Sequence, residues 1–127
     1  MGAPTYELTV RRHFSAAHAL RRYEGPCSRL HGHNYQVEIT VTGHSLDDLG
    51  MVIDFGELKR VCDEVIDQLD HRMLNDLEAF SETNATSERL AEHLYREVAR
   101  RLATGPSSLR SVRVWETPTS AVTYRED

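Results

Sequence analysis

Two stretches near the N-terminus alternate between apolar and polar residues, which is the pattern of half-buried β-strands. The first covers residues 6–18 and the second residues 34–42. The apolar face of the second stretch consists of Tyr35, Val37, Ile39 and Val41. Residues 19–30 lie between the two and contain Gly25-Pro26, which is typical of a loop. The pattern therefore predicts an antiparallel pair of strands.

The middle of the chain changes to a three- and four-residue period, which is typical of amphipathic helices. The apolar stripe of the first helix consists of Leu58, Val61, Cys62, Val65, Ile66 and Leu69. That of the second consists of Leu90, Ala91, Leu94, Tyr95, Val98 and Leu102. We expect Asp70-His71 to close the first helix, and residues 84–88 to start the second with a capping hydroxyl. Residues 104–106, Thr-Gly-Pro, are expected to end it.

Alternation returns near the C-terminus, over residues 111–117 and again over 121–124. The order ββααββ predicts an α+β fold in which two helices cover one face of a four-stranded antiparallel sheet. We expect residues 1–127 to form a single domain, because this length supports one core. The outer strands are unpaired edges, and closing such edges against other copies is a common solution. We therefore expect an oligomer.

The composition argues against several classes of protein. The net charge is -5 and charged residues make up 28%, which disfavours a nucleic-acid-binding surface and a disordered chain. No apolar run approaches the roughly 18 residues of a membrane span, and the N-terminus lacks the basic and apolar regions of a signal peptide. The two cysteines, Cys27 and Cys62, do not suggest a disulfide framework. We therefore expect a cytoplasmic protein with neither a membrane nor a nucleic acid as partner.

Three histidines carry the main candidate chemistry. In an extended strand His31 and His33 project to the same side, and Gly32 between them lets a ligand come close. Two imidazoles supply half of a tetrahedral shell, for which zinc is the usual ion. The best candidate for a third ligand is His18, whereas His13 has the opposite parity and should face away. A lone histidine is more often structural, but three in this arrangement favour a metal.

Other polar residues have a functional and a structural interpretation. Cys27 beside a metal would be a base or nucleophile, or else the fourth ligand of a closed structural zinc site. Asp70-His71 offers a proton relay, although a solvated helix end is the more frequent case. Glu116 is either an exposed strand end or a buried carboxylate that pairs with the N–H edge of a guanidine-like heterocycle. Basic pairs such as Arg21-Arg22 suit a phosphorylated small molecule, although solvated surface arginines are commoner.

Six segments carry a resemblance to a known family, and they follow one another along nearly the whole chain. They are Phe14 to His18, Cys27 to Tyr35, Ile53 to Lys59, Leu69 to Asp76, Thr86 to Glu88, and Glu116 to Thr117. Together they resemble the 6-pyruvoyltetrahydropterin synthase / 6-carboxytetrahydropterin synthase family. The resemblance implies a T-fold, in which the sheets of several subunits close into a barrel with the helices outside. It also implies trimers stacked into hexamers.

The resemblance implies a zinc-dependent reaction and a role for each candidate residue. Zinc would be bound by His18, His31 and His33. Cys27 would be the catalytic base, and Asp70 with His71 would form the proton relay. Glu116 would anchor the pterin, helped by Thr86 and Ser87. The three residues between Cys27 and His31 are similar to the queuosine-pathway branch, although Ala85 stands where that branch often has proline. The implied reaction converts 7,8-dihydroneopterin triphosphate to 6-carboxy-5,6,7,8-tetrahydropterin, acetaldehyde and triphosphate.

Two alternative functions are also compatible with the sequence. The first keeps the fold and the zinc but forms a pyruvoyl product, as a 6-pyruvoyltetrahydropterin synthase of a biopterin pathway does. The second is a zinc-stabilised binding domain without turnover, in which Cys27 closes the metal shell. Relatives that form a hydroxymethyl pterin for folate have a glutamate in or beside the cysteine position. They are disfavoured because Ser28 follows Cys27.

Overall fold

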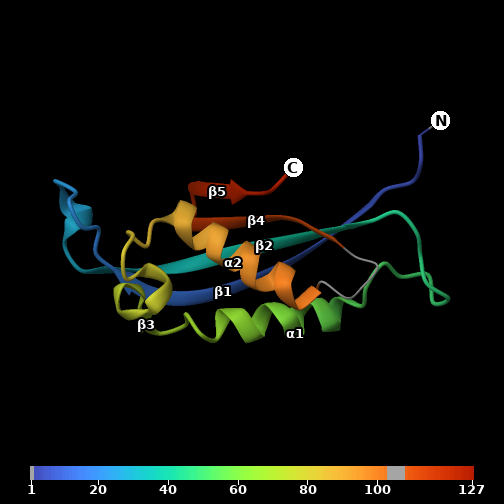
Figure 1. Ribbon diagram of the computed structural model, residues 1–127, viewed down its shortest axis with the longest axis horizontal. Helices are drawn as coiled ribbons and strands as arrows, with labels where there is room; N and C mark the ends of the chain where they lie inside the picture. Colours follow the sequence, from blue (N-terminus) through green and yellow to red (C-terminus); the bar gives the residue numbers. More distant parts are fainter. Residues whose placement is uncertain (1, 103–107) are drawn as a thin grey trace.

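The computed structural model describes residues 2–102 and 108–127, which form one sheet with two α-helices against it (Figure 1). In chain order the elements are β1 (Tyr6–His18), β2 (His31–Gly43), α1 (Phe55–Ile66), β3 (Arg72–Met73), α2 (Ser87–Leu102), β4 (Ser108–Thr117) and β5 (Ser120–Tyr124). The strand order in the sheet is β3-β1-β2-β4-β5. Neighbouring strands are antiparallel except for β3, which runs parallel to β1. The expected α+β fold and the order of its main elements are confirmed.

β1 and β2 form a long ribbon that organises the sheet. They pair over their whole lengths, from Tyr6 opposite Gly43 to His18 opposite His31. Residues directly opposite each other in an antiparallel pair project on the same face of the sheet. Phe14 and Tyr35 are such a pair, and both side chains are buried, with their rings stacked 5.0 Å apart. This face of the ribbon is therefore the core face.

Both helices cover the core face (Figure 1): α1 packs against β1, α2 packs against β4 and β5, and the two helices also contact each other. Most residues of the two predicted apolar stripes are buried within these helices. Asp54 caps α1 by accepting from the backbone N–H of Gly56 at 2.7 Å, and Thr86 caps α2 by accepting from that of Arg89 at 3.2 Å. The helix end expected at residues 104–106 lies outside the described residues. Within the described ranges, no helix combines the length and the apolar character needed to cross a bilayer.

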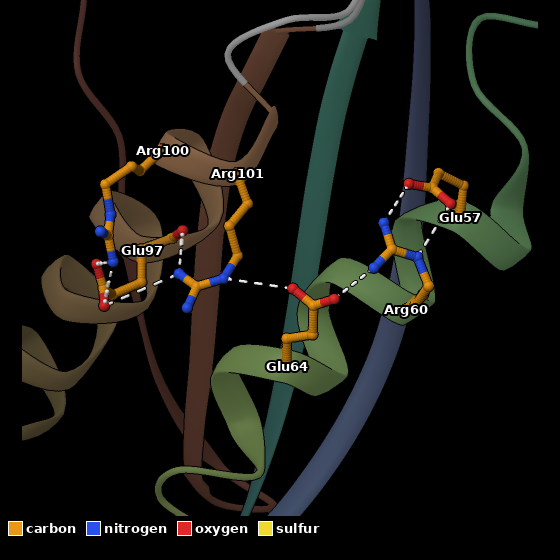
Figure 2. Close-up of polar contacts among 6 residues, drawn as sticks. All are labelled: Glu57, Arg60, Glu64, Glu97, Arg100 and Arg101. Atoms are coloured by element: carbon orange, nitrogen blue, oxygen red, sulfur yellow. Dashed lines mark hydrogen bonds and ion pairs between the residues drawn. The ribbon is translucent and has the colours of Figure 1, made fainter.

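Charged side chains connect the two helices on their solvent side (Figure 2). Arg101 of α2 lies with its Nε 3.5 Å from Oε2 of Glu64 in α1. Glu64 also pairs with Arg60, and Arg101 donates to the backbone carbonyl of Glu97 at 2.9 Å. Exposed ion pairs of this kind each contribute roughly 0–1 kcal/mol. The buried apolar stripes, rather than this network, therefore hold the helices against the sheet.

The structure corrects the prediction for the end of α1. The helix ends at Ile66, and the chain then continues through tight turns to His71, whose φ of 59° lies in the left-handed region. β3 follows at once and pairs with β1, at an edge where no strand was expected. Two residues are too few to show an alternating pattern in the sequence, so only the fold reveals β3. The sheet consequently has five described strands instead of four.

Candidate metal centre

The three candidate metal ligands come together at one end of the β1–β2 ribbon. His18 and His31 lie directly opposite each other, and His33 lies two residues further along β2 on the same face. The fourth group is Glu116 of β4. Val114 pairs with Val37 of β2 in an antiparallel register, so Glu116, two residues after Val114, lies near the His31 end of β2. One ligand atom from each of these four residues lies within 4.8 Å of the others. We call His18, His31, His33 and Glu116 the His/Glu cluster.

Backbone carbonyls fix two of the imidazoles in one tautomer. Nδ1 of His18 is 2.7 Å from the carbonyl oxygen of Ala85, and Nδ1 of His31 is 2.7 Å from that of Arg29. A carbonyl oxygen only accepts, so each Nδ1 carries the hydrogen and each neutral ring presents a lone pair on Nε2. These two Nε2 atoms are 2.9 Å apart. Two facing lone pairs are stable only with a proton or a cation between them, so the pair fits a metal ion.

His33 and Glu116 complete a donor set that suits zinc. Oε1 of Glu116 is 3.1 Å from Nε2 of His33 and 3.6 Å from Nε2 of His18. The His33 Nε2 atom is buried and makes no hydrogen bond with the described residues. Burial lowers the pKa of His33, and the two neighbouring histidines lower it further, although Glu116 opposes them. The neutral imidazole that this favours is the form that binds metals, and three nitrogens with one carboxylate oxygen are usual ligands of zinc.

The His/Glu cluster has a buried side and an accessible side. The side chain of His18 is 2% exposed, whereas those of His33 and Glu116 are 20% and 33% exposed. Tyr35 lies on the buried side, with its ring 5.4 Å from that of His33. Its hydroxyl is buried without a hydrogen-bond partner among the described residues, and burial and Glu116 both raise its pKa. His31 is also partly exposed, so a ligand can approach the cluster from the side of His31, His33 and Glu116.

Cys27 lies close to the cluster along the chain but is not a member of it. It occupies a short 3-10 turn, Pro26–Ser28, and its side chain is partly exposed. Its backbone carbonyl accepts from the N–H of Leu20 at 2.9 Å, so the loop is tied back to the residues that follow His18. The sulfur is not among the four groups whose ligand atoms come within 4.8 Å of one another. The fourth group beside the three imidazoles is thus Glu116 and not Cys27.

Asp70 and His71 lie at the edge of β1, apart from the His/Glu cluster. The carboxylate of Asp70 accepts from the backbone N–H of Ser15 at 2.9 Å and lies 2.9 Å from Nδ1 of His71. The hydrogen bond from Ser15 lowers the pKa of Asp70, and His71 lowers it further. His71 is 81% exposed and lines an open hollow of about 460 Å³ together with Ser15, Asn34 and the cluster residue His33. Neither Asp70 nor His71 is among the four residues of the cluster.

Thr86 and Ser87 lie where α2 begins, next to the residue that holds His18. The Thr86 hydroxyl is occupied as the helix cap. The Ser87 hydroxyl is buried and has no hydrogen-bond partner among the described residues. Ala85, immediately before them, supplies the carbonyl bonded to His18. The start of α2 therefore lies beside the cluster, and Ser87 has unused hydrogen-bonding capacity there.

Several groups that shape this site were not predicted from the sequence. Tyr35 was expected only as an apolar strand residue, although it has the same parity as His31 and His33, which places it on their face. No role was predicted for the carbonyl of Ala85, which no side-chain pattern can reveal. Glu116 was expected near a ligand rather than among the histidines themselves.

Comparisons with known proteins show what the chain is similar to over nearly its whole length. The family model described as 6-pyruvoyl tetrahydropterin synthase matches residues 7–127. The chain is 41% identical to the 6-carboxy-5,6,7,8-tetrahydropterin synthase of Bacillus subtilis (strain 168), over 95% of this chain and 86% of that protein. It is 38% identical to the 6-pyruvoyl tetrahydrobiopterin synthase of Drosophila melanogaster, over 96% of this chain and 80% of that protein.

Among solved structures, the 6-pyruvoyl tetrahydropterin synthase of Caenorhabditis elegans superposes with a TM-score of 0.86 at 33% identity. The superposition covers 98% of this chain and 97% of that one. The expected T-fold is thereby confirmed for the subunit. The chain, whose family match spans nearly its whole length, belongs to the 6-pyruvoyl tetrahydropterin synthase family.

Proposed function

We propose that this protein is a zinc-dependent 6-carboxy-5,6,7,8-tetrahydropterin synthase of queuosine and 7-deazapurine biosynthesis. It would convert 7,8-dihydroneopterin triphosphate to 6-carboxytetrahydropterin, acetaldehyde and triphosphate. The observation that carries the proposal is the His/Glu cluster, in a chain 41% identical to a protein named for this activity. Both relatives are named as pterin synthases, which supports the broader conclusion that this protein is an enzyme that acts on a pterin.

His18, His31 and His33 would hold the zinc, since the lone pairs of the first two converge and the buried Nε2 of the third makes no hydrogen bond within the described part of the chain. Zinc bound there would supply Lewis-acid stabilisation for the negative charge that develops on the side-chain oxygens of the substrate. The carbonyls of Ala85 and Arg29 keep the first two rings in the ligating tautomer. The buried side formed by Tyr35 excludes water from the back of the site.

Glu116 would bind the pterin ring. Its carboxylate is partly exposed at the accessible side of the cluster, so it can accept two parallel hydrogen bonds from the N–H edge of the heterocycle. The Ser87 hydroxyl, which bonds to none of the described residues, and the neighbouring Thr86 would contact the ring from the start of α2. These contacts would orient the substrate side chain toward the zinc and toward Cys27.

Cys27 would act as the base that moves a proton on the substrate side chain, and Asp70 with His71 would serve as a relay. Asp70 and His71 are not members of the cluster of their own chain, and His71 is 81% exposed, so it is available to a second copy. We propose that edge strands of neighbouring copies pair, so that the relay of one copy serves the cluster of another. Co-expression of a His31→Ala and a His71→Ala chain tests this arrangement. Each variant should be inactive alone, and the mixture should regain activity; a mixture without activity would contradict the shared site.

Product analysis tests the main proposal. Purified protein loaded with zinc is incubated with 7,8-dihydroneopterin triphosphate, and the products are identified by mass spectrometry. Acetaldehyde and a carboxypterin are expected. A pyruvoyl product that retains the side-chain carbons would instead make the protein a 6-pyruvoyltetrahydropterin synthase, which the 38% identity to the Drosophila protein keeps as the second candidate.

Replacement of Cys27 by alanine separates an enzyme from a zinc-stabilised binding domain. A catalytic thiol predicts that zinc content and melting temperature are retained while turnover is lost. A fourth zinc ligand predicts that zinc is lost and that the melting temperature falls. The presence of Glu116, and not Cys27, within the cluster favours the first outcome.

A further inference from the structure

Two asparagine side chains form hydrogen bonds with the backbone of residues 19–21, just after β1, as a neighbouring strand would. Ala19 donates its N–H to Oδ1 of Asn75 at 2.9 Å and accepts from Nδ2 of Asn75 at 2.9 Å. Arg21 donates its N–H to Oδ1 of Asn84 at 2.7 Å and accepts from Nδ2 of Asn84 at 2.9 Å. Each carboxamide thus provides the one donor and one acceptor that a peptide group of a neighbouring strand would provide. We call the side chains of Asn75 and Asn84 the asparagine clamp.

Leu20 lies between the two clamped residues, and its backbone N–H points away from the clamp. In such a chain, consecutive residues direct their backbone hydrogen bonds to opposite sides. Ala19 and Arg21 bond to the clamp, and Leu20 between them donates its N–H to the carbonyl of Cys27 at 2.9 Å. The backbone of Cys27 is therefore fixed by Leu20, which in turn is fixed by its two clamped neighbours.

The segments that carry the clamp are themselves held by Arg21. Its guanidinium donates to the backbone carbonyls of Phe80 at 3.1 Å and Thr83 at 3.2 Å, and it lies 3.4 Å from that of Asn75. Arg21 is exposed, as expected for a surface arginine, but its guanidinium also bonds to backbone carbonyls within the fold. Asn84 also directly precedes Ala85, whose carbonyl fixes the ring of His18. One stretch of chain therefore holds both a cluster imidazole and, through the clamp, the loop of Cys27.

We propose that Asn75 and Asn84 are positioning residues that fix the Cys27 thiol relative to the His/Glu cluster. The part of this inference that concerns turnover rests on the proposed role of Cys27 as base. A displacement of a catalytic group by about 1 Å can lower a rate about 100-fold. Loss of the clamp should therefore lower kcat about 10- to 100-fold and change KM by less than about threefold, because Glu116 and the three histidines are anchored on β1, β2 and β4.

The two cysteines of the chain report separately on the loop and on the core. Cys27 is partly exposed, whereas Cys62 is fully buried in α1, where burial raises its pKa to about 12. Alkylation by iodoacetamide, followed by peptide mass spectrometry, measures each thiol in the same sample. In Asn75→Ala and Asn84→Ala, the Cys27 alkylation rate should change severalfold while Cys62 stays unlabelled. Asn75→Asp keeps the acceptor for Ala19 but loses the donor, so its effects should be intermediate.

Val65→Ala is the matched control, because Val65 is fully buried in α1 and lies outside the loop. It should raise Cys62 labelling without changing kcat or the Cys27 rate. Unchanged kcat and unchanged Cys27 labelling in both alanine variants would overturn the inference. So would an increase of Cys62 labelling that parallels the change at Cys27, because it would show a general loosening of the fold. If an alanine variant fails to fold, the corresponding aspartate variant replaces it. A wild-type protein without turnover on the pterin would refute the proposed function, while the labelling would still test the clamp.

Discussion

Removal of the metal should leave the protein folded, and His31→Ala tests this most directly. In the described part of the chain, the hydrophobic core is built from apolar side chains of the sheet and both helices and includes none of the four cluster residues. The fold therefore does not depend on the ion in the way that a zinc finger does. His31 is half-exposed, and its ring makes one backbone hydrogen bond, to Arg29, so the truncation itself should cost about 1 kcal/mol.

The lost ion adds a larger amount. At a free zinc concentration about 100 times Kd, binding stabilises the folded state by about 2.7 kcal/mol. For a chain of 127 residues, 1 kcal/mol shifts Tm by about 3–5 °C. The variant should consequently melt on the order of 10 °C below the zinc-loaded wild type and still unfold cooperatively.

Zinc content is measured by plasma mass spectrometry, and folding by far-UV circular dichroism with a thermal melt. His13→Ala is the matched control, because His13 is exposed and has the parity of the face opposite His18. It should change neither zinc content nor Tm. If His31→Ala has no far-UV signal of structure at 25 °C, the site is a structural one. If it retains a full equivalent of zinc, His31 is not a ligand. Either result refutes the reasoning.

Three further predictions concern single positions. Glu116→Ala should weaken pterin binding about 10- to 100-fold, the value of charge-assisted hydrogen bonds, with zinc content unchanged; loss of zinc would identify Glu116 as a metal ligand instead. A Cβ added at Gly43 would lie 2.5 Å from Cγ1 of Val52, so Gly43→Ala should reduce the free energy of unfolding by about 1–3 kcal/mol in urea titrations. Adding Val52→Ala should relieve part of this loss, whereas strictly additive losses would count against the contact. Burial lowers the pKa of His93 below its usual 6.5, so between neutral pH and about pH 5 the unfolded chain binds more protons and stability should fall as pH falls. His93→Phe should flatten that slope, and an unchanged slope would exclude His93 as its source.

The site was predictable from the sequence wherever one strand or one helix decides the geometry. Side chains two apart in a strand share a face whatever the strand pairs with, so the common direction of His31 and His33 followed from their spacing. The parity of residues 6–18 likewise put His18 on the face of Phe14 and His13 on the other. The helical stripes were found in the same way, because their period is a property of the helix itself.

Positions that depend on contacts between distant segments were not predictable in this way. The short β3 depends on how the chain turns after α1, and the same turn sends Asp70 and His71 to the outer edge of β1. Glu116 joins the histidines because of the register between β2 and β4, in which Val37 pairs with Val114, a residue far away along the chain. The clamp depends on two asparagines that reach backbone groups more than 50 residues away.

The amino-acid sequence by itself determined the periods of the elements, the faces of the strands and the identity of the candidate ligands. The tertiary structure alone decided which of these groups meet. It joined Glu116 to the three imidazoles and left the Cys27 sulfur, Asp70 and His71 outside that group. The physical reason is that side-chain direction follows from local backbone geometry, whereas proximity requires the loops to close and the core to pack.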